Sequence, residues 1–215
     1  NQRKNMKRIY RLGLFIILIN FLTSCNGQTK QEPNETKRTK QVGGGCEGCE
    51  LMYVEMPKNI SSEHTSIGWT EGKQKLILTG KVFQIDGKAP ASDVVIYYWH
   101  TDENGLYSSD NQTPKQAKEH GKLRGWVKTD KSGNYTIQTS RPAAYPNDNI
   151  PQHIHLSIKE PDIANEYYAD LYFDDDPLYL KHKKKYGKLD RAGTELLRVV
   201  LDGNIQIAEH NIVLG

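Results

Sequence analysis

Short runs of β-branched and aromatic residues, each followed by a tight-turn dipeptide, recur along the chain from residue 75 onward. Asp86-Gly87, Asn104-Gly105, Ser132-Gly133 and Asp202-Gly203 supply turns, because glycine tolerates the positive φ angles that such turns need. Helical periodicity is weak by comparison. The pattern predicts an all-β fold, an antiparallel β-sandwich. We expect strands at residues 75–84, 94–100, 124–129, 134–139, 153–159, 167–173, 196–201 and 205–214, and short helical insertions at 113–120 and 176–186.

The first 24 residues have the composition of a secretory signal. A basic segment that contains Arg3, Lys4 and Arg8 precedes an apolar run at 12–22, which is too short to span a membrane. The run ends in Leu22-Thr23-Ser24-Cys25, which resembles the lipobox of bacterial lipoproteins. We therefore expect a lipoprotein-type signal peptide at 1–24 and lipidation of Cys25, which would anchor the mature protein in the bacterial cell envelope, periplasmic or surface-exposed. The alternative is an ordinary signal peptide with a chance cysteine.

This processing changes what the charge implies. The whole chain carries a net charge of +3, but removal of residues 1–24 takes away five basic residues and no acidic one, which leaves −2. The basic excess thus belongs to the signal peptide, and we expect no nucleic-acid partner. The basic run at 181–185 is better explained as a solvated loop than as a surface or lipid contact.

Residues 25–45 are polar, end in three glycines and are expected to form a flexible tether. The folded domain is expected at 46–215. It opens with Cys46 and Cys49, which we expect to form a local disulfide, because thiols outside the cytoplasm tend to oxidise. A redox or metal-binding role for this pair is the weaker alternative.

His153-Ile154-His155 places two imidazoles on one predicted strand. Side chains alternate along a strand, so both histidines would project from one face and Ile154 from the other. Their Cβ atoms would lie roughly 6.5–7 Å apart, close enough to share a metal ion. Two polar residues on a solvated sheet face explain this tripeptide equally well when it is considered alone.

Two tyrosines favour the metal interpretation. Tyr145 lies between Pro142 and Pro146 in the loop that leads to the histidines, and Tyr107 follows the Asn104-Gly105 turn. A phenol has a pKa near 10, so it binds a metal as phenolate only where a strong Lewis acid stabilises the anion. Ferric iron does so better than zinc or copper(I). Convergence of two phenols and two imidazoles would indicate a non-haem iron(III) enzyme.

The order of motifs then resembles one family, the intradiol ring-cleavage dioxygenases, and in particular proteins of the protocatechuate 3,4-dioxygenase β-subunit type. The resemblance runs from about residue 79 to 173 and is carried by Gly80-Lys81-Val82-Phe83, Tyr97-Tyr98-Trp99-His100, Gly105-Leu106-Tyr107, Arg141-Pro142, Tyr145-Pro146 and His153-Ile154-His155. It implies a sandwich of the prealbumin-like, intradiol dioxygenase type. It also implies that Tyr107, Tyr145, His153 and His155 bind Fe(III).

The resemblance implies an activity as well. Such an enzyme opens a catechol-type aromatic diol between its two hydroxylated carbons, using O2, and releases a muconate-type diacid. Tyr145 would accept a proton from the substrate. Family members carry an arginine three residues before the first histidine, where this chain has Ile150. Arg141 or Arg124 is the candidate replacement for that charge, and Arg141 is therefore a second expected catalytic residue.

A binding module is the alternative function. The Asp-Gly turn, the Val94–Ile96 run and the segment 129–137 also resemble carboxypeptidase-regulatory or prealbumin-like modules of bacterial surface proteins. That interpretation explains a sandwich and a lipid anchor without catalysis. It gives no reason for two histidines on one strand face preceded by Tyr145, so we favour the enzyme. Zinc or copper on the histidines alone, and a cupin-type site, are weaker alternatives.

Overall fold

A computed structural model describes residues 48–163, 166–185, 189–190 and 193–214. The expected signal peptide, Cys25, the tether and Cys46 lie outside these residues and remain predictions. Cys49 is buried and disulfide-bonded. No helix among the described residues is both long and apolar enough to cross a membrane.

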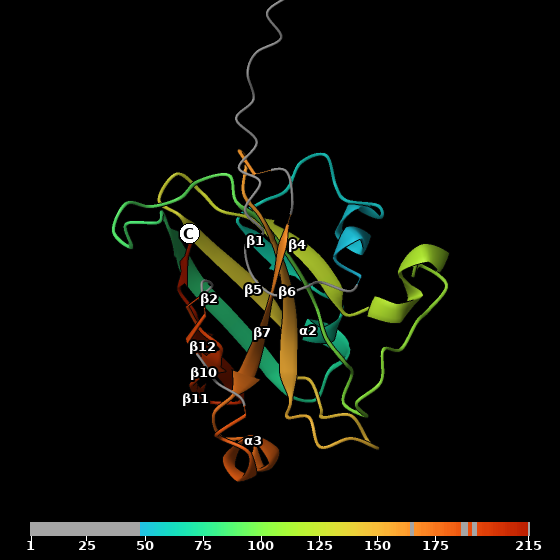
Figure 1. Cartoon of the computed structure of the whole chain (residues 1–215). Helices are drawn as coiled ribbons and strands as arrows, with labels where there is room; N and C mark the ends of the chain where they lie inside the picture. The colour runs from blue at the N-terminus through green and yellow to red at the C-terminus, as the bar shows by residue number, and fades with distance from the viewer. Residues whose placement is uncertain (1–47, 164–165, 186–188, 191–192, 215) are drawn as a thin grey trace, which may run out of the picture. The chain divides into compact units, whose positions relative to one another are not determined.

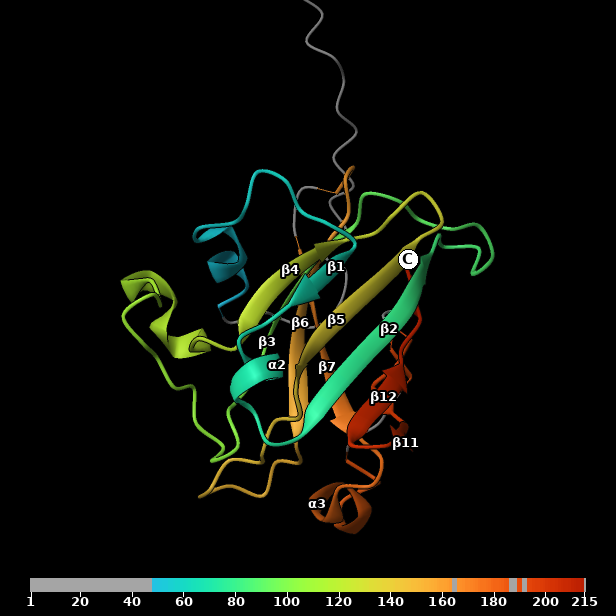
Figure 2. The same ribbon diagram turned by 180° about the vertical axis from the view of Figure 1, so that it is seen from behind.

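Two β-sheets form the body of the fold (Figure 1). The larger sheet has the order β1 (Glu63–Thr65), β5 (Asn134–Ser140), β2 (Lys75–Phe83), β12 (Ile205–Glu209) and β11 (Val199–Asp202), and β13 (Ile212–Val213) also pairs with β2. Figure 2 shows β1, β5, β2 and β12 side by side. The second sheet has the order β10 (Leu196–Leu197), β7 (Tyr167–Phe173), β6 (His153–Lys159), β3 (Val95–Trp99) and β4 (Arg124–Lys128). β8 (Leu189–Asp190) and β9 (Gly193–Thr194) form a separate pair.

The described helical elements are short. They are the 3₁₀ segments η1 (Cys49–Tyr53) and η2 (Lys115–His120) and the α-helices α2 (Gly68–Glu71) and α3 (Pro177–Lys181). The 3₁₀ segment η2 thus covers the last six residues of the insertion expected at 113–120, and α3 covers about the first half of the one expected at 176–186. Asp176 caps α3, because its carboxylate accepts hydrogen bonds from the backbone N–H groups of Leu178 and Tyr179 at 2.7 and 3.0 Å.

Both sheets are mixed, so the expectation of an antiparallel sandwich is confirmed only in part. Neighbouring strands β3 and β4, or β6 and β7, pair antiparallel as expected. β12 and β13 pair parallel with β2, β1 pairs parallel with β5, and β10 pairs parallel with β7. β12 and β2 lie far apart in the sequence, and a pattern of local runs and turns carries no information on the direction of such distant partners.

Two predicted strands are each divided in the structure. Residues 196–201 form β10 and β11, which belong to different sheets, and residues 205–214 form β12 and β13, which meet β2 on either side of His210. Gly80 makes this second break possible. A Cβ atom at Gly80 would lie 1.8 Å from the carbonyl oxygen of His210, so only glycine allows the two backbones to come this close.

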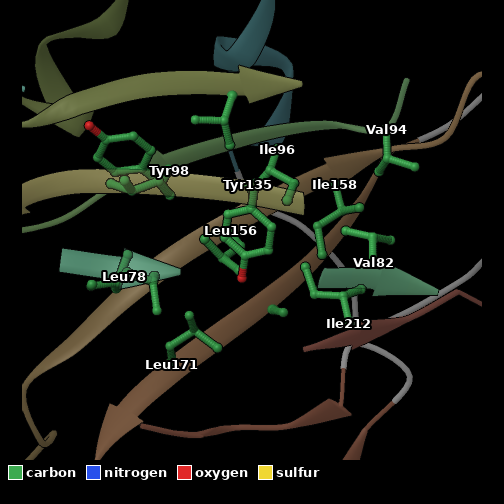
Figure 3. Close-up of a cluster of buried hydrophobic side chains, with 14 of the residues drawn as sticks. Leu78, Val82, Val94, Ile96, Tyr98, Tyr135, Leu156, Ile158, Leu171 and Ile212 are labelled. Atoms are coloured by element: carbon green, nitrogen blue, oxygen red, sulfur yellow. The ribbon is translucent and has the colours of Figure 1, made fainter. Parts of the chain in front are cut away.

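The facing sides of the two sheets enclose the hydrophobic core (Figure 3). Leu78 and Val82 of β2 lie against Leu156 and Ile158 of β6, and all four side chains are fully buried. The even-numbered residues of β6 therefore all face the core: Ile154, Leu156 and Ile158.

The odd-numbered residues of β6 face the opposite side of the second sheet. There, Tyr97 and Trp99 of β3 form a second buried cluster with Met52 of η1. The second sheet is thus buried on both faces, and His153 and His155 lie on the face that η1 helps to cover.

A substitution at Leu156 tests the hydrophobic core between the two sheets. We expect Leu156→Ala to lower the free energy of unfolding by about 2–5 kcal/mol, because it removes a buried side chain and leaves a cavity between the sheets. Urea unfolding measures the change. Val200 of β11 is 62% exposed, so Val200→Ala is the matched control, with an expected change within about 0.5 kcal/mol. Equal losses in the two variants would contradict the placement of β6.

Candidate metal centre

The centre is built on β6, where the register of the sheet fixes the neighbours of each histidine. His155 lies opposite Trp99 of β3 and opposite Asp170 of β7. His153 lies opposite Tyr172 of β7. The ring of Trp99 stacks on that of His155, with centroids 4.9 Å apart and planes 26° apart. The imidazoles are therefore held between aromatic and acidic side chains of the same sheet face.

Tyr107 enters from the loop that follows β3. Asp102 orders this loop, because its carboxylate accepts hydrogen bonds from the backbone N–H groups of Asn104 and Leu106 at 2.8 and 3.1 Å. The hydroxyl of Ser108 also donates to Asp102. These bonds form a compact turn that directs the chain back toward the histidine strand.

Tyr145 enters from the loop between β5 and β6, which packs directly on the Tyr107 loop. The hydroxyl of Thr101 donates to the carbonyl of Ala143 at 2.6 Å, and the N–H of Ala143 donates to the carbonyl of Asp102 at 3.1 Å. Gly105 has a φ of +77°, and a Cβ there would lie 2.1 Å from the carbonyl oxygen of Ala144. The two tyrosine loops thus hold each other in place.

The four predicted ligand side chains converge. The Tyr107 hydroxyl lies 2.6 Å from the Tyr145 hydroxyl and 2.7 Å from Nε2 of His155. The Tyr145 hydroxyl lies 3.3 Å from Nε2 of His153 and 3.4 Å from Nε2 of His155, and these two nitrogens are 3.1 Å apart. Ligand atoms that share one ion at bond lengths of about 2 Å lie about 3 Å from their neighbours. The spacing of the four donors fits one metal ion.

The hydrogen bonds on the far side of each imidazole set its tautomer. Nδ1 of His153 lies 2.6 Å from the carbonyl oxygen of Pro151, and Nδ1 of His155 lies 2.6 Å from the Asp170 carboxylate. Both oxygens only accept, so both Nδ1 atoms carry the proton and both Nε2 atoms present a lone pair. Burial lowers the pKa of His153 to about 4, which keeps this ring neutral at pH 7.

The pKa values of the two phenols, by contrast, are raised. Burial raises the pKa of Tyr107, and the hydrogen bond and charge of Tyr145 and the charge of Asp170 raise it further. Burial also raises the pKa of Tyr145. Such phenols ionise near neutral pH only when a strong cation offsets the cost of a buried anion. Two phenolates and two neutral imidazoles suit a hard trivalent ion better than zinc or copper(I).

A hydrogen-bonded group behind His155 was not predicted from the sequence. The hydroxyl of Tyr168 donates to Oδ1 of Asp170, and that of Tyr172 donates to Oδ2 at 3.0 Å. Burial alone would raise the pKa of Asp170, but hydrogen bonds and charge from His155 hold it below its usual range. The alternation of residues 168, 170 and 172 on the strand that follows the histidines could have indicated this group.

Comparison with known proteins identifies the family. The family model described as Dioxygenase matches residues 52–185, more than half of the chain. The chain belongs to the intradiol dioxygenase family. Family membership favours the enzyme interpretation of the sequence over a binding module.

Individual members of this dioxygenase family agree in sequence and fold. The protocatechuate 3,4-dioxygenase β chain of Burkholderia cepacia is 28% identical over 142 residues, which cover 62% of this chain and 57% of that one. Catechol 1,2-dioxygenase of Candida albicans is 27% identical over 169 residues, 65% of this chain and 54% of that one. The chain thus spans about half of the length of each relative. The dioxygenase domain of a carbohydrate-binding fusion protein from Streptomyces sp. SirexAA-E superposes with a TM-score of 0.55 at 22% identity, and covers 74% of this chain and 94% of that domain.

Neither candidate arginine bonds to any of the four donor side chains. The Arg141 guanidinium binds both carboxylate oxygens of Asp175 at 2.6 and 2.9 Å and donates to Gln152 at 2.7 Å. It also stacks on the ring of Phe173, 4.3 Å from its centroid. Arg124 donates to the Tyr97 hydroxyl at 3.4 Å. Ile150 is half-buried and adds no charge.

His100 also lies apart from the four donors, although it follows Trp99 directly. It is 1% exposed, with Nδ1 2.8 Å from the carbonyl of Thr101 and Nε2 2.8 Å from the hydroxyl of Thr139. Burial lowers its pKa from 6.5 to about 4, against a smaller opposing effect of the Thr101 hydrogen bond. His100 therefore joins the two sheets as a neutral hydrogen-bonding group.

The lowered pKa of His100 predicts that the folded protein loses stability in acid. The folded-state pKa of His100 lies below the unfolded value, so the unfolded chain takes up the proton first and stability is lost as the pH falls from about 6.5 toward 4. The contribution at pH 5 is about 2 kcal/mol. We expect His100→Gln to lose that much less stability than the unchanged protein between pH 7.5 and 5, measured by urea unfolding. An unchanged slope would contradict the burial of a neutral imidazole.

Proposed function

We propose that this protein is a non-haem iron(III) dioxygenase that cleaves a catechol-type diol. The observation that carries the proposal is the convergence of two phenolic oxygens and two imidazole Nε2 atoms, each of which lies 2.6–3.4 Å from at least two of the others. Tyr107, Tyr145, His153 and His155 would hold the iron. The iron would supply the Lewis acidity that stabilises a bound diol as its dianion, and it would activate the diol for reaction with O2.

The balanced reaction adds O2 to the diol. The carbon–carbon bond between the two hydroxylated carbons breaks, and both atoms of O2 enter the product, a muconate-type diacid. The relatives named above as protocatechuate and catechol dioxygenases support this reaction class.

Tyr145 is the residue that we propose to take a proton from the diol, at its Oη atom. Its hydroxyl lies farther from Nε2 of His155 than the hydroxyl of Tyr107 does, at 3.4 Å against 2.7 Å. Its loop position also leaves it less constrained by sheet packing than the histidines on β6. A phenol in this position can serve either as a ligand or as a general base.

Arg141 would support this reaction through the loop. It stands at the start of the Tyr145 loop, and its bond to Gln152 ties that start to the residue before His153. The bidentate pair with Asp175 anchors the same guanidinium to the segment after β7. We propose that Arg141 fixes the distance between Tyr145 and the histidines.

Colour tests the metal centre. We expect the protein loaded with Fe(III) to be red, because tyrosinate-to-iron(III) charge transfer absorbs visible light. Tyr107→Phe and Tyr145→Phe should each shift or remove this band in an absorption spectrum. Tyr53→Phe is the matched control, because Tyr53 is 45% exposed and its hydroxyl bonds to Glu166. A protein that binds iron and stays colourless would refute the proposal.

Oxygen uptake tests catalysis separately. With catechol, protocatechuate or hydroxyquinol as substrate, we expect one O2 consumed per diol, measured with an oxygen electrode and by absorbance of the product. Tyr145→Phe should lower kcat by about 10²–10⁴-fold, because it removes the proposed base. Tyr53→Phe should leave kcat unchanged. A coloured protein without uptake on any of the three diols would retain the iron site and refute the activity toward these substrates.

A further inference from the structure

The two histidine ligands differ in what lies behind them. Nδ1 of His153 donates to a neutral group, the backbone carbonyl of Pro151, at 2.6 Å. Nδ1 of His155 donates at the same distance to a carboxylate, that of Asp170. The two imidazoles thus both direct Nε2 toward the other donors, but the hydrogen-bond acceptor behind one ring is neutral and the acceptor behind the other is charged.

The Asp170 carboxylate is built into the sheet. It lies opposite His155 in the β6–β7 register, and its side chain is 18% exposed while that of His155 is 12% exposed. Both oxygens accept a tyrosine hydroxyl, Oδ1 from Tyr168 and Oδ2 from Tyr172. Among the described ion pairs, Asp170 is joined to His155 and to no lysine or arginine. Its negative charge is therefore directed at the imidazole.

Asp170 belongs behind the ring rather than among the ligands. Its oxygen contacts Nδ1 of His155, whereas the four donors meet at Nε2 on the other side of that ring. A carboxylate in this position fixes the tautomer of a metal-bound histidine and makes the ring a stronger donor. Because the Asp170 side chain is only 18% exposed, solvent screens its charge weakly, and the charge also acts on the ion beyond the ring.

We infer that Asp170 is a positioning residue that makes His155 the stronger of the two imidazole ligands and biases the bound iron toward the ferric state. The inference rests on the proposed function, since it concerns the same ion. It assigns Tyr168 and Tyr172 a role as well: their hydroxyls orient the carboxylate and moderate the charge that it offers to His155.

Asp170→Asn isolates the charge. The amide oxygen can still accept a hydrogen bond from His155, but the negative charge is gone. We expect affinity for Fe(III) to fall about 10–100-fold in a chelator competition, and affinity for Fe(II) to fall less, because attraction scales with the charge of the ion. Each tenfold fall in the affinity for Fe(III) relative to the affinity for Fe(II) raises the reduction potential of the bound iron by about 59 mV. The charge-transfer band should move to longer wavelength, since the ion becomes easier to reduce.

Asp174→Asn is the matched control. Asp174 carries the same charge four residues further on, but it pairs with Arg198 at 3.4 Å. The substitution changes the net charge of the protein equally, so the band, the affinity ratio and the potential should stay at their original values.

Tyr172→Phe keeps the inference testable if Asp170→Asn does not fold. It leaves the carboxylate in place and removes one donor from it, so more of the charge falls on His155. We expect a band shift in the opposite direction, to shorter wavelength. An unshifted band in this variant overturns the inference.

The outcomes separate the two claims. A colourless wild-type protein after iron loading overturns the proposed function and this inference with it. A red wild type whose Asp170→Asn variant matches Asp174→Asn in band position and affinity ratio overturns the role of Asp170 alone.

Discussion

The pairing of β6 between β3 and β7 is the constraint on which the rest of the structure depends. This register places Ile154, Leu156 and Ile158 in the core and turns His153 and His155 to the other face. A slip of one residue would exchange the two sets, burying imidazoles in the hydrophobic core and turning three aliphatic side chains toward the four donors' side of the sheet. The free energy that stabilises the sandwich therefore also fixes the orientation of the histidines.

The same register determines the surroundings of the histidines. Trp99 stacks on His155 from one neighbouring strand, and Asp170 bonds to it from the other. A strand pairing thus supplies the ring contact and the hydrogen bond that hold the imidazole in one orientation. The loops contribute only the two tyrosines, and those loops are joined to each other by Thr101 and Ala143.

The sequence predicted most strands, because alternation along one strand and turn residues at fixed places are local patterns. The convergence of the four donors was implied by the resemblance to the intradiol dioxygenases, since it joins residues from separate loops and a strand. The sequence did not predict parallel pairing of β12 with β2, since direction is decided between distant segments. It also missed β1, which is three residues long and has no hydrophobic alternation of its own. The role of Asp170 was missed for a related reason, because a carboxylate on a strand has no meaning until its cross-strand partner is known. The arginine that was expected to supply charge is instead held by Asp175 and Gln152, contacts that no motif indicates.

The close approach of Gly105 to Ala144 has a mechanical consequence. A methyl group at residue 105 would overlap the neighbouring carbonyl at 2.1 Å, so the backbones of the two tyrosine loops are interlocked at this point. The peptide around Tyr145 cannot be displaced inward without pushing the Gly105 turn ahead of it. Rotation about the side-chain bonds of Tyr145 changes the distance of its phenol from the imidazoles and leaves this backbone contact intact.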